Sequence, residues 1–315
     1  MNTALDTLKK ELHKVIIGQE AMIDGLLIGL LCEGHILVEG APGLAKTTTI
    51  NTLSKAIGLD SKRIQFTPDL LPSDILGAQI YNPKDHSFSI KKGPLFTHLL
   101  LADEINRAPA KVQSALLEVM QERQVTIADE TFELDAPFLV MATQNPIENE
   151  GVYALPEAQL DRFMMKIVVN HNSEEEELVI MKKIANKESK PIQPVLTIEE
   201  LFAAQEAVNT VHIDEELEKY IIQIIVATRE PDKFGIDNIA GNILFGASPR
   251  ASIDLYKAAK AQAFLRGNSF VTPADIGFVV HAVLRHRIVL SYEAMAKNIT
   301  TDRLISTIIE TLPVP

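Results

Sequence analysis

The chain has 315 residues and a net charge of −12, with 46% hydrophobic and 23% charged residues. These values are ordinary for a globular protein with a substantial core, in two domains or one large one. The acidic balance disfavours a broad surface for nucleic acid or anionic membranes, although a local basic channel would escape this count. The single cysteine, Cys32, excludes an intrachain disulfide and a cysteine-rich metal site, and its apolar surroundings predict a core residue.

The N-terminal stretch is charged and predicts a helix over 6–14, with Asp6 as a possible N-cap, rather than a signal peptide. No run of about 18 apolar residues occurs, so we expect no membrane span and a cytoplasmic location. A second helix is expected over about 20–32. Ile17 and Gly18 precede it in an apolar segment that could line an adenine pocket or simply join two helices.

The stretch 35–47 reads HILVEGAPGLAKT and is the centre of the chain. A short buried strand is expected over 35–38, followed by a glycine-rich loop and a helix over 48–57. This is the layout of a phosphate-binding P-loop, in which backbone N–H groups and a helix N-terminus surround a polyphosphate. Lys46 would reach the β- and γ-phosphates, and the Thr47 hydroxyl would hold Mg²⁺. An ordinary strand–turn–helix without nucleotide is the alternative.

The loop departs from the usual P-loop pattern at one position. Ala45 stands where a glycine usually precedes the lysine. Alanine tolerates that place only with a negative φ, so we expect the sharp turn to depend on Gly40 and Gly43.

The segment after the P-loop helix contains connectors and hairpins. A short strand is expected over 63–66. Partial alternation predicts β-hairpins over 79–90, with a turn at 82–85, and over 125–134. Between them, a helix over 111–124 has an apolar face at helical spacing.

Two carboxylates end the apolar run 99–102. Ligands bind at the carboxyl ends of strands in an open parallel sheet, so Asp103 would hold Mg²⁺ and Glu104 could polarise an attacking water. A strand that ends in solvated acids is the common alternative. Their position roughly 60 residues after the P-loop favours the catalytic interpretation.

A third buried strand, expected over 138–142, leads to Asn145. The same argument about strand ends directs this side chain at the γ-phosphate or the attacking water, although Asn-Pro is also a common turn signal.

A short helix over 155–163 then leads into the last strand, over 164–169. Arg162 lies at the end of that helix, where its local context favours a salt bridge to Asp161 or Glu157.

The composition changes after Val169, and helix-start signals replace strand signals. These signals are Ser173 with Glu176, Thr197 with Glu200, and Thr272 with Pro273. We therefore expect a helical domain over 172–315, with 170–172 as the hinge.

One further segment of this domain is a candidate site. Ser248 suits an N-cap and Pro249 the first helical position, which places Arg250 in the first turn. A cation there opposes the helix dipole, so a bound phosphate would favour it; a salt-bridged surface arginine is the alternative.

Six segments, in this order, closely resemble the MoxR family of AAA+ ATPases. They are GAPGLAKT (40–47), RIQFTPDLLPSDILG (63–77), LLLADEINRAP (99–109), MATQNPIE (141–148), LPEAQLDRFMMK (155–166) and GASPRA (246–251). Alanine before the lysine occurs within the MoxR pattern. The resemblance implies an α/β core over 1–171, with a five-stranded parallel sheet in the order 5-1-4-3-2 and two β-hairpin insertions. It also implies a helical lid over 172–315.

The resemblance also implies site roles. Gly40, Gly43, Lys46 and Thr47 correspond to Walker A, Asp103 and Glu104 to Walker B, Asn145 to sensor 1, Arg162 to an arginine finger acting on a neighbour's ATP, and Arg250 to sensor 2. The nucleotide-binding residues would be Ile17, Gly18, Gly40, Ala41, Pro42, Gly43, Leu44, Ala45, Lys46, Thr47, Thr48 and Arg250. Thr47 and Asp103 would hold the metal, and Lys46, Glu104, Asn145 and Arg162 would be catalytic.

The function implied is Mg-ATP hydrolysis in a hexameric ring. The ring would remodel or mature partner proteins, or insert metal cofactors into them. The partners implied carry von Willebrand A domains. Three other functions remain open: a P-loop kinase, a nucleic-acid motor and an ATP-binding scaffold without turnover. The net charge argues against the motor, although Lys84, Lys91 and Lys92 in the first hairpin leave it a narrow opening.

Overall fold

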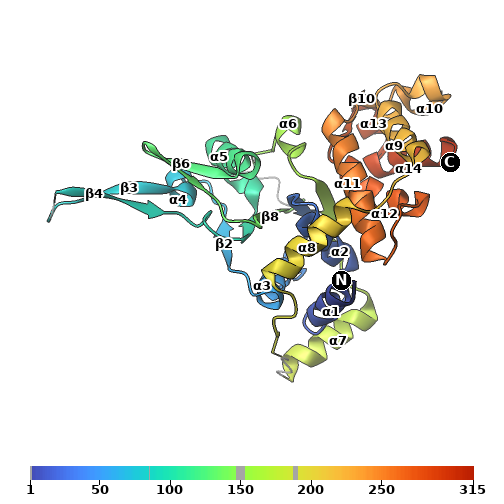
Figure 1. The fold of residues 1–315 in the computed structure, drawn as a ribbon. Helices are drawn as coiled ribbons and strands as arrows, with labels where there is room; N and C mark the ends of the chain where they lie inside the picture. Colours follow the sequence, from blue (N-terminus) through green and yellow to red (C-terminus); the bar gives the residue numbers. More distant parts are fainter. Residues whose placement is uncertain (1, 85, 147–152, 187–190) are drawn as a thin grey trace.

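The computed structural model describes residues 2–84, 86–146, 153–186 and 191–315 (Figure 1). At its centre is a parallel five-stranded sheet in the order β2-β5-β8-β1-β9. The strands are β1 (Ile36–Glu39), β2 (Ser61–Gln65), β5 (Leu99–Asp103), β8 (Leu139–Gln144) and β9 (Met165–Val168). Counted along the chain, their order is 5-1-4-3-2, so the expected topology is confirmed. Position 85 of the expected turn and positions 147 and 148 of the MATQNPIE segment lie outside the described residues.

The central strands are continuous apolar runs because both faces of the sheet are covered. Leu99 and Leu101 point into one hydrophobic cluster, which also contains residues of α1, α2 and α3. Leu100 points into a second cluster, which includes Leu116 of α5. The sheet is thus a buried layer whose carboxyl edge is left for polar groups.

The predicted helices of this part are present, with two corrections: α1 begins earlier than expected, and α6 is shorter than the expected 155–163 and ends before Arg162. They are α1 (Asn2–His13), α2 (Glu20–Leu31), α3 (Lys46–Ile57), α4 (Pro72–Leu76), the 3-10 helix η1 (Ile105–Arg107), α5 (Ala110–Glu122) and α6 (Glu157–Leu160). Asp6 lies inside α1, so its predicted N-cap role is wrong. The helix extends further upstream because Leu5 continues the buried face of Leu8 and Leu12. Cys32 follows α2 and is half-buried rather than fully buried.

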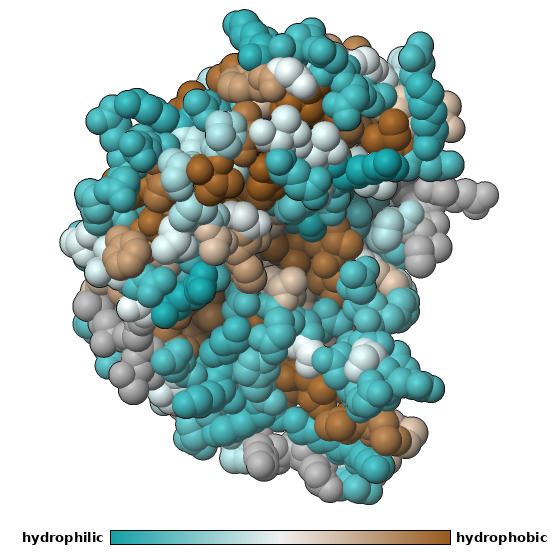
Figure 2. Space-filling model, turned by 90° about the vertical axis from the view of Figure 1, so that its right-hand side faces the viewer, coloured by the Kyte–Doolittle hydropathy of each residue, from teal (hydrophilic) through white to brown (hydrophobic). Residues whose placement is uncertain are grey.

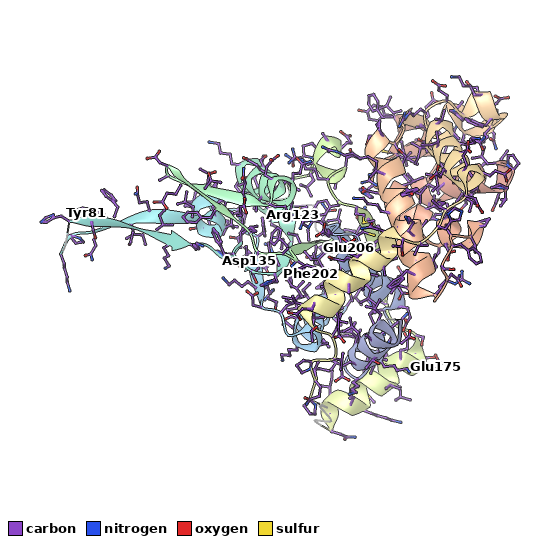
Figure 3. The ribbon with its side chains drawn as sticks, viewed as in Figure 1. Tyr81, Arg123, Asp135, Glu175, Phe202 and Glu206 are labelled. Carbon is purple, nitrogen blue, oxygen red and sulfur yellow. The ribbon has the colours of Figure 1, made fainter. Side chains whose placement is uncertain are left out.

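Both predicted hairpins are present. The first pairs β3 (Gly77–Asn82) with β4 (Ser87–Lys92), and the second pairs β6 (Gln124–Ile127) with β7 (Glu130–Glu133). The β3–β4 hairpin extends away from the body, and Tyr81 lies near its far end (Figure 3). There the ring centroids of Tyr81 and Phe88 are 5.1 Å apart, and both side chains are exposed.

The chain after β9 is helical, as predicted, and forms a lid beside the sheet. Its helices are α7 (Glu174–Ala185), α8 (Ile198–Asn209), α9 (Glu215–Ala227), η2 (Pro231–Phe234), α10 (Asp237–Ala240), α11 (Pro249–Leu265), α12 (Pro273–Leu284), α13 (Tyr292–Ala296) and α14 (Thr301–Thr311). The three predicted capping signals are used as N-caps. One feature was not expected: β10 (Ile243–Phe245) pairs with β11 (Val289–Leu290). Viewed from the lid side, apolar patches interrupt the hydrophilic surface (Figure 2).

Within the described ranges, no helix is long and apolar enough to cross a membrane.

Candidate functional site

The loop between β1 and α3 turns into the helix through left-handed backbone. Gly43 has φ 85° and Ala45 has φ 57°, so the expectation of a negative φ at Ala45 is wrong. Ala45 is the residue directly before α3, and the turn there demands this conformation, at a cost of about 1 kcal/mol for alanine. Gly40 serves a different purpose: a Cβ at this position would lie 2.9 Å from the Val169 carbonyl oxygen.

A cavity of about 340 Å³ opens beside this loop. It is lined by Pro42, Gly43, Ala45, Lys46, Thr47, Thr48, Arg63, Asp103, Glu104 and Asn145. Lys46 is largely buried, and its Nζ donates to the Gly40 carbonyl at 2.8 Å. Burial lowers the pKa of Lys46, while the charges of Asp103 and Glu104 oppose that shift. The cavity therefore combines a desolvated cation, backbone amides at a helix N-terminus and two carboxylates.

Both carboxylate oxygens of Asp103 are held by neighbouring strands. Thr143 Oγ1 in β8 donates to Oδ1 at 2.6 Å. Arg63 in β2 donates to Oδ2 through Nη2 at 2.7 Å and through Nε at 3.1 Å. Asp103 would therefore hold a metal either through water or after Arg63 has moved.

The Glu104 carboxylate is held from two sides. The residue is left-handed, with φ 56° and ψ 50°, and its N–H donates to Thr143 Oγ1 at 2.9 Å. Its Oε2 accepts from Gln65 Nε2 at 2.6 Å and from Arg107 Nη1 at 3.0 Å. Gln65 and Arg107 thus fix the orientation of this carboxylate at the cavity wall.

The structure brings nine of the predicted site residues together around this cavity, and Gly40, Ala41 and Leu44 of the same loop lie outside its lining. The nine are Pro42, Gly43, Ala45, Lys46, Thr47, Thr48, Asp103, Glu104 and Asn145. The sequence reasoning gave no role to Arg63, Gln65, Arg107 or Thr143, which hold the two carboxylates. Arg63 and Gln65 are two residues apart on β2 and so share one face of the strand, but that spacing alone does not place them beside Asp103 and Glu104.

Neither candidate arginine lines the cavity of its own chain. Arg162 Nη1 donates to the Leu117 carbonyl of α5 at 3.0 Å. Arg250 Nη1 lies 3.7 Å from Asp161 Oδ2, and its side chain is half exposed. Asp161, one of the two local partners expected for Arg162 beside Glu157, lies instead near a lid arginine.

Ile17 and Gly18 are also outside the cavity lining. Asn172 Nδ2 donates to the Ile17 carbonyl at 2.8 Å, and Gln19 Nε2 donates to Asn172 Oδ1 at 2.8 Å. Gly18 has φ 66°, and a Cβ there would lie 2.6 Å from Asn172 Nδ2. Hydrogen bonds thus hold residues 17–19 against Asn172, which lies between β9 and α7.

The cavity residues fit Mg-ATP. No cluster of three or more His, Cys, Asp or Glu able to hold a metal occurs among the described residues. The cavity lining offers a metal the Thr47 hydroxyl and the Asp103 carboxylate, with phosphate and water as the remaining ligands. This is the usual arrangement for Mg²⁺ beside a nucleotide.

Comparison with known proteins agrees with this geometry. The profile described as "ATPase family associated with various cellular activities (AAA)" matches residues 35–165, and that of an AAA lid domain matches residues 238–308. Together with the five-stranded sheet, the P-loop cavity and the helical lid, these matches define an ATPase of the AAA+ class.

Relatives narrow the class. Chaperone MoxR1 of Mycobacterium tuberculosis is 46% identical over 305 residues, covering 97% of this chain and 81% of that protein. Protein MoxR of Paracoccus denitrificans is 31% identical, covering 96% and 94%. A crystal structure of a candidate ATPase from Cytophaga hutchinsonii is 50% identical, with a TM-score of 0.94 over 100% of this chain and 96% of that one. The chain belongs to the MoxR family of AAA+ ATPases.

Proposed function

We propose that this protein hydrolyses Mg-ATP at contacts between copies of itself. It uses the energy to remodel or mature partner proteins, or to insert metal cofactors into them. One observation supports the placement of the site between copies. The cavity gathers the groups that bind phosphate and activate water, yet the candidate arginines Arg162 and Arg250 lie outside it. Arg63 does line the cavity but is bound to Asp103, so a further arginine that reaches the phosphates would come from a neighbouring copy.

Each cavity residue has a distinct role in this proposal. Lys46 and the N-terminus of α3 bind the phosphates. Thr47 and Asp103 hold Mg²⁺, which when bound offsets charge on the β- and γ-phosphates. Glu104 accepts a proton from the attacking water and Asn145 orients it. A neighbour's Arg162 adds positive charge where the transition state needs it.

Head-to-tail contacts of this kind close into a ring, and we propose a hexamer. The core over 1–171 and the lid over 172–315 would rotate about 170–172 during the cycle and transmit work. The name of Chaperone MoxR1 supports a client-directed role, and the family resemblance supports partners with von Willebrand A domains. The cytoplasm is the proposed location.

The test is ATP turnover across a range of protein concentrations, comparing the wild type with Glu104→Gln. Turnover per subunit should rise with concentration in the wild type and collapse in Glu104→Gln, which should still bind ATP. Concentration-independent turnover would remove the role of Arg162 between copies. Tight ATP binding without turnover at any concentration would instead favour a scaffold. Strong retention of single-stranded DNA at physiological salt would favour a nucleic-acid motor.

A further inference from the structure

Arg287 is a buried cation where the lid meets the core. It lies between α12 and β11, and only 1% of its side chain is exposed. Its Nε donates to Asp161 Oδ1 at 2.9 Å, and its Nη2 donates to Asp254 Oδ2 at 2.5 Å. Nη2 also donates to the Phe163 carbonyl at 2.8 Å. The Arg287 side chain therefore binds the residues on either side of Arg162, Asp161 and Phe163.

Asp161 is the meeting point of the lid contacts. Besides Arg287, it accepts from Ser248 Oγ at 2.8 Å and lies near the Arg250 guanidinium. Ser248 is the N-cap of α11, so the Asp161 carboxylate also lies at the positive end of that helix. Arg162 follows Asp161 in the chain, and Arg250 lies in the first turn of α11. Asp161 thus lies near the Arg250 guanidinium and is joined to Arg162 through the backbone.

The network is costly to bury, which argues for a specific role. Burial raises the pKa of Asp254, and the Arg287 charge opposes that shift. Buried charges are costly to desolvate, and a hydrophobic cluster often replaces them without loss of stability. What Arg287 adds beyond stability is geometry, because its planar fork fixes Asp161 and Asp254 in one orientation. The Arg162 side chain itself is held by the core, through its hydrogen bond to the Leu117 carbonyl of α5.

We propose that Arg287 is a positioning residue that holds Arg162 and Arg250 as one unit for ATP hydrolysis on a neighbouring copy. The inference rests on the proposed function and deepens it. Arg287 is absent from the lining of the P-loop cavity of its own chain, so it acts through Asp161 rather than on nucleotide.

The first test is Arg287→Lys, which keeps the charge but loses the fork. We expect kcat to fall about tenfold or more, because small displacements of a catalytic group are costly, while the KM for ATP changes by less than about twofold. Arg285→Lys is the matched control. Arg285 lies two residues away and binds Asp302 and the Lys166 carbonyl, so its variant should keep the wild-type kcat. A raised KM with unchanged kcat would overturn the proposal.

A milder variant guards against misfolding. Ser248→Gly removes the hydroxyl that binds Asp161 but leaves a residue that is tolerated at an N-cap. It should lower kcat in the same direction as Arg287→Lys, by a smaller factor and again without a change in KM. Wild-type kcat in Ser248→Gly, together with wild-type kcat in a folded Arg287→Lys, would contradict the positioning role.

Mixing variants separates positioning from general damage. Arg287→Lys subunits have an intact cavity, and Glu104→Gln subunits have an intact Arg162. In an equal mixture, turnover should recover to about a quarter of the wild-type value, because roughly one head-to-tail junction in four then joins the two intact halves. A merely structural defect within the Arg287→Lys subunit would give no recovery.

A second mixture distinguishes failure of this inference from failure of the proposed function. Arg162→Ala with Glu104→Gln should recover in the same way. Recovery there but not with Arg287→Lys would refute the positioning role alone. Recovery in neither mixture would refute the action of Arg162 between copies, and the positioning role would fall with it.

Discussion

His35 makes the stability of the fold depend on pH in a predictable direction. The side chain is buried just before β1, its Nε2 lies 2.9 Å from the Met120 carbonyl, and its Nδ1 accepts from the Val140 N–H at 3.1 Å. The ring therefore has its proton on Nε2, and a second proton on Nδ1 would face another N–H. Burial lowers the pKa of His35 to about 4, and the Met120 carbonyl opposes that shift only in part.

The size of the effect follows from the two pKa values. In the unfolded chain, His35 would titrate near its ordinary pKa of about 6.5. As the pH falls below that value, His35 binds a proton in the unfolded state but not in the folded state. The free energy of unfolding therefore decreases progressively down to about pH 4. Between pH 7 and pH 5 the loss from this one residue is about 2 kcal/mol.

The assay is urea unfolding at both pH values for the wild type and His35→Gln. Glutamine does not titrate, and its amide can donate to the Met120 carbonyl and accept from Val140. The free energy of unfolding should fall more steeply in the wild type, so that the gap between the two proteins changes by about 2 kcal/mol from pH 7 to pH 5. Buried His286 contributes equally to both proteins and cancels. Parallel pH dependences would show that His35 is not the source.

Three further outcomes are expected. Ala45→Gly relieves the positive φ and should leave the free energy of unfolding unchanged or raise it by up to about 1 kcal/mol. By contrast, Ala203→Gly, at an exposed position inside α8, should lower it by about 0.5–1 kcal/mol; equal losses would contradict the argument. Thr143→Val removes the hydroxyl bound to Asp103 and should lower the free energy of unfolding by about 1–3 kcal/mol. It should also weaken Mg²⁺-dependent ATP binding in calorimetry, whereas Thr143→Ser should change neither quantity. Cys32 packs against the core although part of the residue is exposed, and desolvation raises the pKa of its thiol to about 12. Iodoacetamide at pH 8 should therefore alkylate it slowly until urea unfolds the chain; rapid native labelling would refute this.

The positions of the strand ends could be predicted because they depend on local pattern. Each central strand is an apolar run that ends abruptly in a polar residue, and parallel strands end at one edge. That rule brings Asp103, Glu104 and Asn145 to one edge of the sheet, and the P-loop motif after β1 adds Lys46 to the same cavity.

The support of those residues could not be predicted, because it depends on pairing between strands. Gln65 lies opposite Asp103 in the β2–β5 register, and this places Gln65 and Arg63 beside the two carboxylates. No pattern within β2 sets that register. The left-handed Ala45 was missed for a related reason: the loop geometry, rather than the intrinsic preference of alanine, decides its φ.

Arg162 shows how a distant contact can change the interpretation of a local one. Its local sequence favours a salt bridge to Asp161 or Glu157. The structure instead commits Asp161 to Arg287, which lies 126 positions further along the chain, and to the N-cap of α11. The lid thereby holds the backbone beside Arg162, while the Arg162 side chain turns to a carbonyl of α5. Under the proposed function, Asp161 would then not compete with a neighbouring copy's phosphate for Arg162, because its carboxylate already pairs with Arg287.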